Sequence, residues 1–206
     1  MATNSEPAPF QHPANPRDRR HGPAGYSDYS SYRPWLRDEF SYRCVYCLIR
    51  EQWGRVSGEF DLDHFVPQVA DPSLVSAYEN LVYSCHRCNL RKADDTVTDP
   101  LWTLAAHTPK VHFDGTVVGL TPEADYIIRN LFLNSPEMIR WRRLWIRICE
   151  LAMECDPDLF RQLFTYPVDL PDLSNCRPPM NSRPDSLYES AFARRERGEL
   201  PETYLE

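Results

Sequence analysis

The pattern of apolar and polar positions predicts two short strands near the centre of the chain. Residues 59–65, EFDLDHF, alternate between apolar and polar side chains, and residues 80–84, NLVYS, form a second, mostly apolar run. Alternation with a period of two is typical of a strand with one buried face. Pro34 and the following WLRDEFSYR predict a short helix before the first strand, and a further helix begins at Asn89.

Beyond residue 100 the pattern changes to a hairpin followed by helices. The sequence VHFDGTVVGL (111–120) predicts a hairpin that turns at an Asp-Gly pair. Helix starts are indicated at Thr121, Ser135 and Asp156, because each is a capping residue followed directly by proline. The helix that begins after Ser135 is expected to continue to about residue 153.

The chain is therefore divided into four segments, and an α+β protein is expected. Low aliphatic content near the N-terminus predicts a flexible arm, and prolines dominate the connector before a last amphipathic helix. The expected segments are the arm (1–33), a central module (34–100), a hairpin with a helical extension (101–165), and the connector with the C-terminal helix over 185–197 (166–206).

Composition and charge limit the possible classes of protein. With 42% apolar and 26% charged residues, the chain is expected to form a packed core. It has neither an apolar stretch long enough for a membrane span nor a secretory signal, so a cytoplasmic location is the default expectation. The net charge of -7 argues against a nucleic-acid partner, unless a local basic surface or a partner protein compensates.

Four of the seven cysteines form two C-x-x-C pairs. Cys44 and Cys47 are separated from Cys85 and Cys88 by 37 residues, and four thiolates suit tetrahedral zinc. Because cysteines would fill all four positions, this zinc is expected to be structural. A redox dithiol or free buried cysteines are the alternatives.

The segment between the two cysteine pairs contains groups suited to phosphodiester hydrolysis. That reaction needs an activated water and a cation at the scissile phosphate. His64 suits the first task, because an imidazole titrates near neutral pH. Asp63 and Asn89 offer oxygen atoms, the ligands that magnesium prefers.

Together these motifs resemble the zinc-bearing HNH (ββα-metal) endonucleases. The sequence reads C-x-x-C, then DLDHFVPQ, then Asn80, then C-x-x-C-N-x-x-K, and the resemblance covers residues 40–95. It implies a zinc-braced ββα-metal module that hydrolyses DNA with a catalytic Mg²⁺ or Mn²⁺. By matched position, His64 would be the general base, Asp63 and Asn89 would hold the catalytic cation, and Asn80 would orient the histidine.

Several neighbouring residues have two interpretations. Asp61 shares a strand face with Asp63, and it either assists the cation or caps a turn. Lys92 either contacts phosphate or is a plain surface lysine, and His86 is expected to be exposed rather than catalytic. In a regular strand Asp63 and His64 would face opposite sides.

Two groups of arginines are candidates for contact with DNA. Arg17, Arg19 and Arg20 lie in the expected flexible arm. In the long helix, positions 140, 143, 147, 150 and 154 form one face with three arginines and two glutamates, which is typical of a solvated, salt-bridged face. An apolar face of the same helix is expected to pack in the core or against a partner (Trp141, Leu144, Ile148 and Leu151).

Two rival functions remain beside the nuclease. The first is a non-catalytic zinc module that binds nucleic acid or protein. The second is a nuclease effector subunit that is active only with a partner, for example an ATPase of a bacterial defence system. A protein partner or a homo-oligomer is compatible with the sequence, which contains no recognisable DNA-reading module.

Overall fold

Three two-stranded antiparallel sheets form the β-structure of the computed structural model, which describes residues 7–13, 18–54, 60–105 and 108–204. One sheet pairs strands from the two ends of the described chain, and the other two sheets pair strands that are closer in sequence. The strands are β1 (Pro23–Ala24) with β6 (Met180–Asn181), β2 (Phe60–His64) with β3 (Leu81–Cys85), and β4 (Pro109–Val111) with β5 (Val117–Gly119).

Helices begin where the capping residues predict them. The side chains of Thr121, Ser135 and Asp156 accept hydrogen bonds from the third residue beyond each. These caps confirm three predicted helix starts. The helices are α1 (Arg33–Glu39), α2 (Glu51–Gly54), α3 (His86–Lys92), α4 (Pro100–Thr103), α5 (Pro122–Asn130), α6 (Pro136–Cys155), α7 (Pro157–Phe164) and α8 (Ala191–Glu196).

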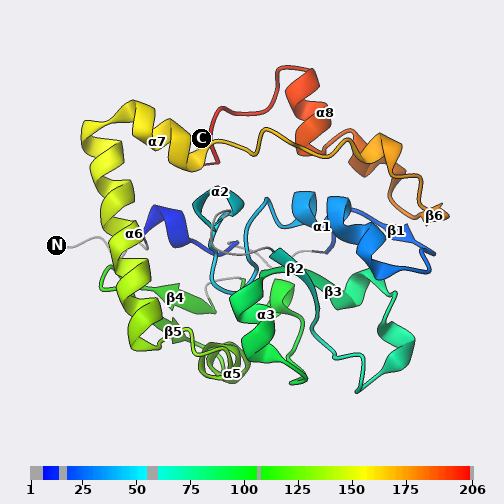
Figure 1. The fold of residues 1–206 in the computed structure, drawn as a ribbon, viewed down its shortest axis with the longest axis horizontal. Coiled ribbons are helices and arrows are strands. Elements are labelled where there is room, and N and C mark those ends of the chain that lie inside the picture. The colour runs from blue at the N-terminus through cyan, green and yellow to red at the C-terminus, as the bar shows by residue number, and fades with distance from the viewer. Residues whose placement is uncertain (1–6, 14–17, 55–59, 106–107, 205–206) are drawn as a thin grey trace.

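The centre of the molecule is the β2–β3 pair with α3 beside it (Figure 1). Asp63 pairs with Val82 and His64 with Leu81, so β2 is regular up to its last residue. Cys85 ends β3 and directly precedes α3, which places both cysteines of the second pair at this junction. The predicted order of strand, loop, strand and helix is confirmed, with the helix beginning three residues earlier than expected.

Helix α6 runs along one side of the molecule, next to the β4–β5 hairpin (Figure 1). Arg142 is buried and its guanidinium donates hydrogen bonds to the carbonyl oxygens of Gly115 and Leu133. These bonds turn the side of the helix that carries Arg142 towards the hairpin.

The prediction that Trp141, Leu144, Ile148 and Leu151 form a buried face of α6 is partly wrong. Leu144 and Leu151 are 58% and 42% exposed, whereas the helix buries a different set of side chains. The apolar pattern alone could not predict that a buried arginine lies on the inner face. The buried residues are Met138, Arg142, Ile146, Cys149 and Ala152.

The described N-terminal residues pack against the rest of the chain, unlike the flexible arm that composition suggested. Phe10 is fully buried and its ring contacts Trp53 and Trp141 edge-on. Arg19 is also buried and donates hydrogen bonds to the backbone oxygens of Glu79 and Leu81. Aromatic and guanidinium contacts supply the packing that the few aliphatic residues could not, and Arg17 lies outside the described residues.

The C-terminal segment crosses the molecule and returns to α1 (Figure 1). The expected continuous helix over 185–197 is divided, because a 3₁₀ turn at Pro184–Leu187 precedes α8 and Ser190 caps that helix. Among the described helices, none combines the length and the apolar character needed to cross a membrane.

Asp38 in α1 joins the N- and C-terminal segments. Its carboxylate accepts hydrogen bonds from His21 Nε2 at 2.8 Å and from the backbone N–H of Ala191 at 2.8 Å. Tyr42 donates to the same carboxylate, and Arg20 forms an ion pair with it. Burial alone would raise the pKa of Asp38, but the hydrogen bond from His21 and the charge of Arg20 outweigh it and lower the pKa.

Replacing Asp38 with asparagine is expected to destabilise the protein by about 1 to 3 kcal/mol, because an amide cannot accept all the hydrogen bonds that His21, Tyr42 and Ala191 donate to the buried carboxylate. The wild-type carboxylate has a lowered pKa when folded, so its stabilising effect is present at neutral pH and is lost as the pH falls through that pKa. Thermal unfolding between pH 3 and 8 should show a flatter acid dependence for Asp38→Asn. An equal effect of Asp185→Asn, at an exposed position, would contradict this role.

Candidate metal and nuclease site

The four cysteines of the two C-x-x-C pairs meet at one point. Their sulfur atoms all lie within 4.8 Å of one another, and Cys47 Sγ is 3.7 Å from Cys85 Sγ. Sulfurs bound at about 2.3 Å to one tetrahedral zinc are about 3.8 Å apart, so the cluster fits that ion. Hydrogen bonds from Cys44, Cys47 and Cys88 lower the pKa of the Cys85 thiol, whereas burial raises the pKa of Cys44 and hydrogen bonds within the cluster raise that of Cys88. Binding of zinc would therefore release protons from the cluster.

A tight turn presents the first cysteine pair to the second. The backbone N–H of Leu48 donates to Cys44 O, and Leu48 adopts a positive φ of 62°. Between the two cysteines, the backbone N–H of Val45 donates to Tyr83 O in β3 at 3.0 Å. The turn is thus attached to the same strand that ends at Cys85.

Replacing Cys88 with serine should abolish stoichiometric zinc binding and lower the unfolding temperature sharply, because binding to such a site contributes to folding. Metal analysis of the purified protein should give about one zinc per chain for the wild type. Cys155→Ser is the matched control, since Cys155 is exposed and outside the cluster. Full zinc content in the Cys88 variant would contradict the assignment.

Asp63 is enclosed between the cysteine turn and α3. Tyr46, which lies between Cys44 and Cys47, donates its hydroxyl to Asp63 Oδ2 at 2.7 Å. On the other side, Lys92 Nζ lies 3.1 Å from Asp63 Oδ1, and both side chains are almost fully buried. Burial raises the pKa of Asp63 despite the opposing effects of Lys92 and Tyr46. The carboxylate is therefore linked directly to the turn that carries Cys44 and Cys47.

Replacing Lys92 with methionine should destabilise the protein by about 3 to 5 kcal/mol, because the buried charge of Asp63 loses its partner. The double variant Lys92→Met/Asp63→Asn should regain part of this loss, since it carries neither charge. Urea unfolding of both variants measures the coupling, with Arg140→Met as a control at an exposed position. Additive losses would mean that the two residues do not form the pair described.

His64 lies on the opposite face of β2 from Asp63. Its Nε2 is 2.8 Å from the carbonyl oxygen of Val75, and the ring of Tyr29 packs edge-on against the imidazole. Because a carbonyl oxygen only accepts, Nε2 carries a proton, and in the neutral imidazole Nδ1 is then the acceptor nitrogen. Gln68, from the same motif, donates to Nδ1 at 3.3 Å. The ring is thus held in one tautomer.

Asn80 supports His64 through the intervening loop. Its side-chain oxygen accepts from the backbone N–H of Val66, and its side-chain nitrogen donates to the carbonyl oxygens of Val66 and Leu74. The loop fixed in this way carries Val75, the hydrogen-bond partner of His64. Asn80 therefore holds the loop next to His64 in place, through hydrogen bonds between its side chain and the loop backbone.

Asn89 contacts Asp61 instead of Asp63. Asn89 Nδ2 donates to Asp61 Oδ2 at 2.9 Å, and His86 Nδ1 lies 3.0 Å from the same oxygen. His86, Asn89 and Lys92 are three residues apart along α3, so they share one helix face over the acidic face of β2. Asp61 is partly exposed and His86 mostly exposed, so the N-terminal end of this helix face lies at the surface.

The structure thus divides the predicted residues between two sides of one strand. Asp61 and Asp63 face the side chains of α3, and His64 faces the loop that Asn80 holds. The motif reasoning missed Tyr46, although its position between two zinc ligands indicated proximity to the site. It also could not identify Val75, because a backbone acceptor leaves no residue-type signal.

Comparison with known proteins assigns the segment that contains these residues to a family. Residues 44–95 match the family model of HNH endonucleases, which confirms the resemblance and identifies this segment as an HNH domain. Among curated proteins, the chain is 30% identical over 108 residues to Septu protein PtuB of Bacillus thuringiensis. That alignment covers 50% of this chain and 41% of PtuB, and it is longer than the HNH segment.

Proposed function

We propose that the HNH domain hydrolyses phosphodiester bonds in DNA, with His64 as the general base. The observation that carries this proposal is the fixed tautomer of His64. Because Nε2–H is bound to Val75 O, the unprotonated Nδ1 is the atom that accepts a proton from water. The hydrogen bond from Gln68 to Nδ1 is long at 3.3 Å, so an incoming water can replace it.

Asp63 and Asn89 are the proposed ligands of a catalytic Mg²⁺ or Mn²⁺, and Asp61 joins them. The contact between Asp61 and Asn89 favours assistance to the cation over the capping of a turn. Carboxylate and amide oxygens suit a hard divalent ion, which when bound would stabilise the charge that develops on the phosphate. Lys92 compensates the charge of Asp63 and positions it. Because its side chain is buried, this role replaces both expectations, a phosphate contact and a plain surface lysine.

A second candidate function is a nuclease subunit that acts with a protein partner. The similarity to Septu protein PtuB extends beyond the HNH segment, so the shared feature is larger than the nuclease domain alone. Leu144 and Leu151 on α6 are apolar, exposed and outside that domain. A partner such as an ATPase would also supply substrate contacts to an acidic chain. The remaining alternative is a zinc module without catalysis.

Plasmid cleavage tests the proposed function. Zinc-loaded protein with Mg²⁺ or Mn²⁺ should convert supercoiled plasmid to nicked or linear forms, and His64→Ala should slow this by about 10²- to 10⁴-fold, the usual contribution of a general base. His112→Ala is the matched control, because His112 is exposed in the β4–β5 turn. Equal rates for both variants would show that His64 is not the base.

The same assay separates the rival functions. Cleavage by the purified chain alone would argue against a strict requirement for a partner. A zinc-loaded chain that cuts neither alone nor with a candidate ATPase would favour the non-catalytic zinc module.

A further inference from the structure

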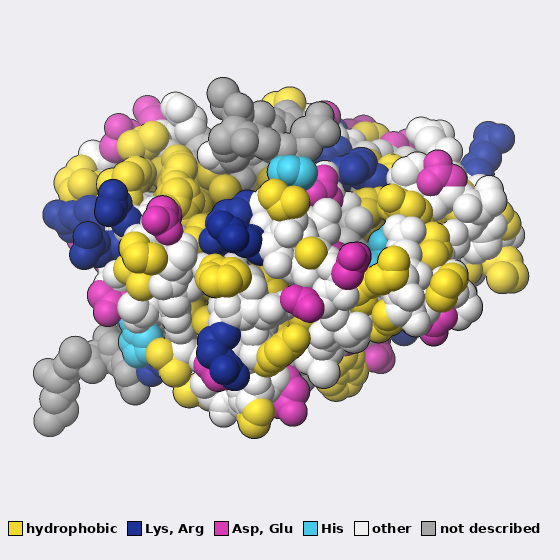
Figure 2. Space-filling model, turned by 60° about the horizontal axis from the view of Figure 1, so that its bottom comes forward, with side chains coloured by type: hydrophobic (Ala, Val, Ile, Leu, Met, Phe, Trp, Pro, Cys, Tyr) yellow, Lys and Arg dark blue, Asp and Glu magenta, His cyan; other side chains and the backbone are white. Residues whose placement is uncertain are grey.

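Helix α6 presents a basic groove outside the HNH domain. Arg140, Arg143 and Arg147 are exposed along one side of the helix and line a groove of about 660 Å³. From residue 138 to residue 149 the helix contains no acidic residue, although the chain as a whole has a net charge of -7. Figure 2 shows Lys and Arg in separate groups on the face drawn.

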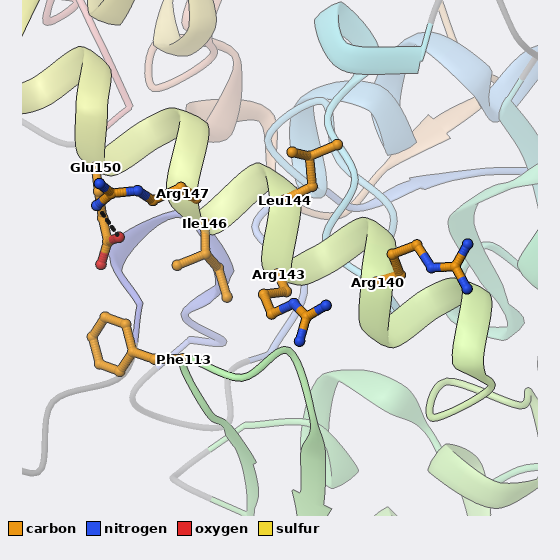
Figure 3. Close-up of a pocket in the computed structure, with 7 residues that line it drawn as sticks. All are labelled: Phe113, Arg140, Arg143, Leu144, Ile146, Arg147 and Glu150. Carbon is orange, nitrogen blue, oxygen red and sulfur yellow. Dashed lines mark ion pairs between the residues drawn. The ribbon is translucent and has the colours of Figure 1, made fainter.

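The groove also has an apolar wall. Phe113 in the β4–β5 turn is 50% exposed and faces the helix across the groove, where Ile146 lies opposite its ring (Figure 3). Leu144 adds a second exposed apolar side chain to the lining. Arg147 is paired with Glu150 at 3.7 Å, but an ion pair this exposed contributes little and can be exchanged for another anion.

Contacts between α3 and the α5–α6 junction connect the groove to the nuclease site. Arg87 donates hydrogen bonds to the carbonyl oxygens of Leu131 and Phe132, just before α6 begins. Arg91 lies over the ring of Phe132 with 5.2 Å to its centroid. Asn89 is between these two arginines on α3, so the helix that carries a proposed cation ligand is also attached to the base of α6.

We propose that this groove binds the phosphodiester backbone of the DNA substrate on its way to the HNH domain. The inference rests on the proposed nuclease function and extends it to a surface that the HNH segment does not include. Arginines at 140, 143 and 147 span about 10 Å along the helix, given a rise of 1.5 Å per residue. Phosphates of one strand of duplex DNA repeat every ~3.4 Å along the axis, so the row can follow several consecutive phosphates.

The apolar wall favours DNA over an acidic protein surface as the occupant. Grooves that bind single-stranded nucleic acid combine positive charge along the backbone with aromatic side chains on which bases stack, so an unpaired strand would use both parts of this groove. The Phe113 ring, half exposed beside three arginines, provides this combination. Guanidinium groups bind phosphate through two parallel hydrogen bonds, and a row of three suits the regular repeat of charge along a nucleic acid backbone.

DNA binding without cleavage tests the groove independently of catalysis. Fluorescence anisotropy of a labelled duplex and a labelled single strand would be measured with the zinc-loaded His64→Ala protein, without added divalent cation, between 50 and 200 mM salt. The groove variant adds Arg140→Gln, Arg143→Gln and Arg147→Gln. The control adds Arg129→Gln, Arg161→Gln and Arg195→Gln, which remove the same charge from exposed sites on other helices.

The groove variant should bind DNA at least tenfold more weakly at 50 mM salt. The slope of the logarithm of the binding constant against the logarithm of the salt concentration should become shallower by about 2 to 3, close to 0.9 for each lost phosphate contact. In the control variant, the affinity and the slope should both change much less. Equal losses in the two variants, or no binding by the parent protein, would overturn the proposal. Plasmid cleavage by the His64-containing protein is a separate measurement, so the nuclease function can hold where the groove fails.

Discussion

The meeting of four thiols from two distant chain segments is the constraint on which the site depends. Cys44 and Cys47 come from a tight turn, and Cys85 and Cys88 from the junction of β3 and α3. Joining them closes a loop that contains the whole of β2. Tyr46 then connects the turn directly to Asp63. A structural ion would therefore fix a carboxylate of the proposed reaction site as well as the fold.

Buried charged groups hold the rest of the chain to this module. Asp38 joins the N-terminal segment, α1 and the start of α8 through one carboxylate, and Arg142 fixes α6 to the hairpin through the carbonyl oxygen of Gly115. Such groups are expensive to bury and costly to leave unpaired. They therefore specify which segments meet more strictly than apolar contacts, which tolerate many partners.

The sequence predicted the parts of the protein that local rules determine. Capping residues located α5, α6 and α7, and motif spacing identified the cysteine cluster and the β2–β3–α3 order. It failed where tertiary contacts decide, as for the packed segment around Phe10 and the inner face of α6. In the site, it selected Asp63 and Asn89 but could not show that Lys92 and Asp61 are their immediate partners.

The two faces of β2 suggest why the nuclease motif places its acids and its histidine in adjacent positions. A strand points consecutive side chains to opposite sides, so Asp63 can be buried under α3 while His64 is held by a separate loop. Each group then has its own support, and neither needs the other to remain in place. Because β2 ends at His64, the proposed reaction would need the phosphate at that strand end, with the imidazole on one side and Asp61 and Asn89 on the other. The strand end, more than any single residue, is therefore where the two proposed functions would meet.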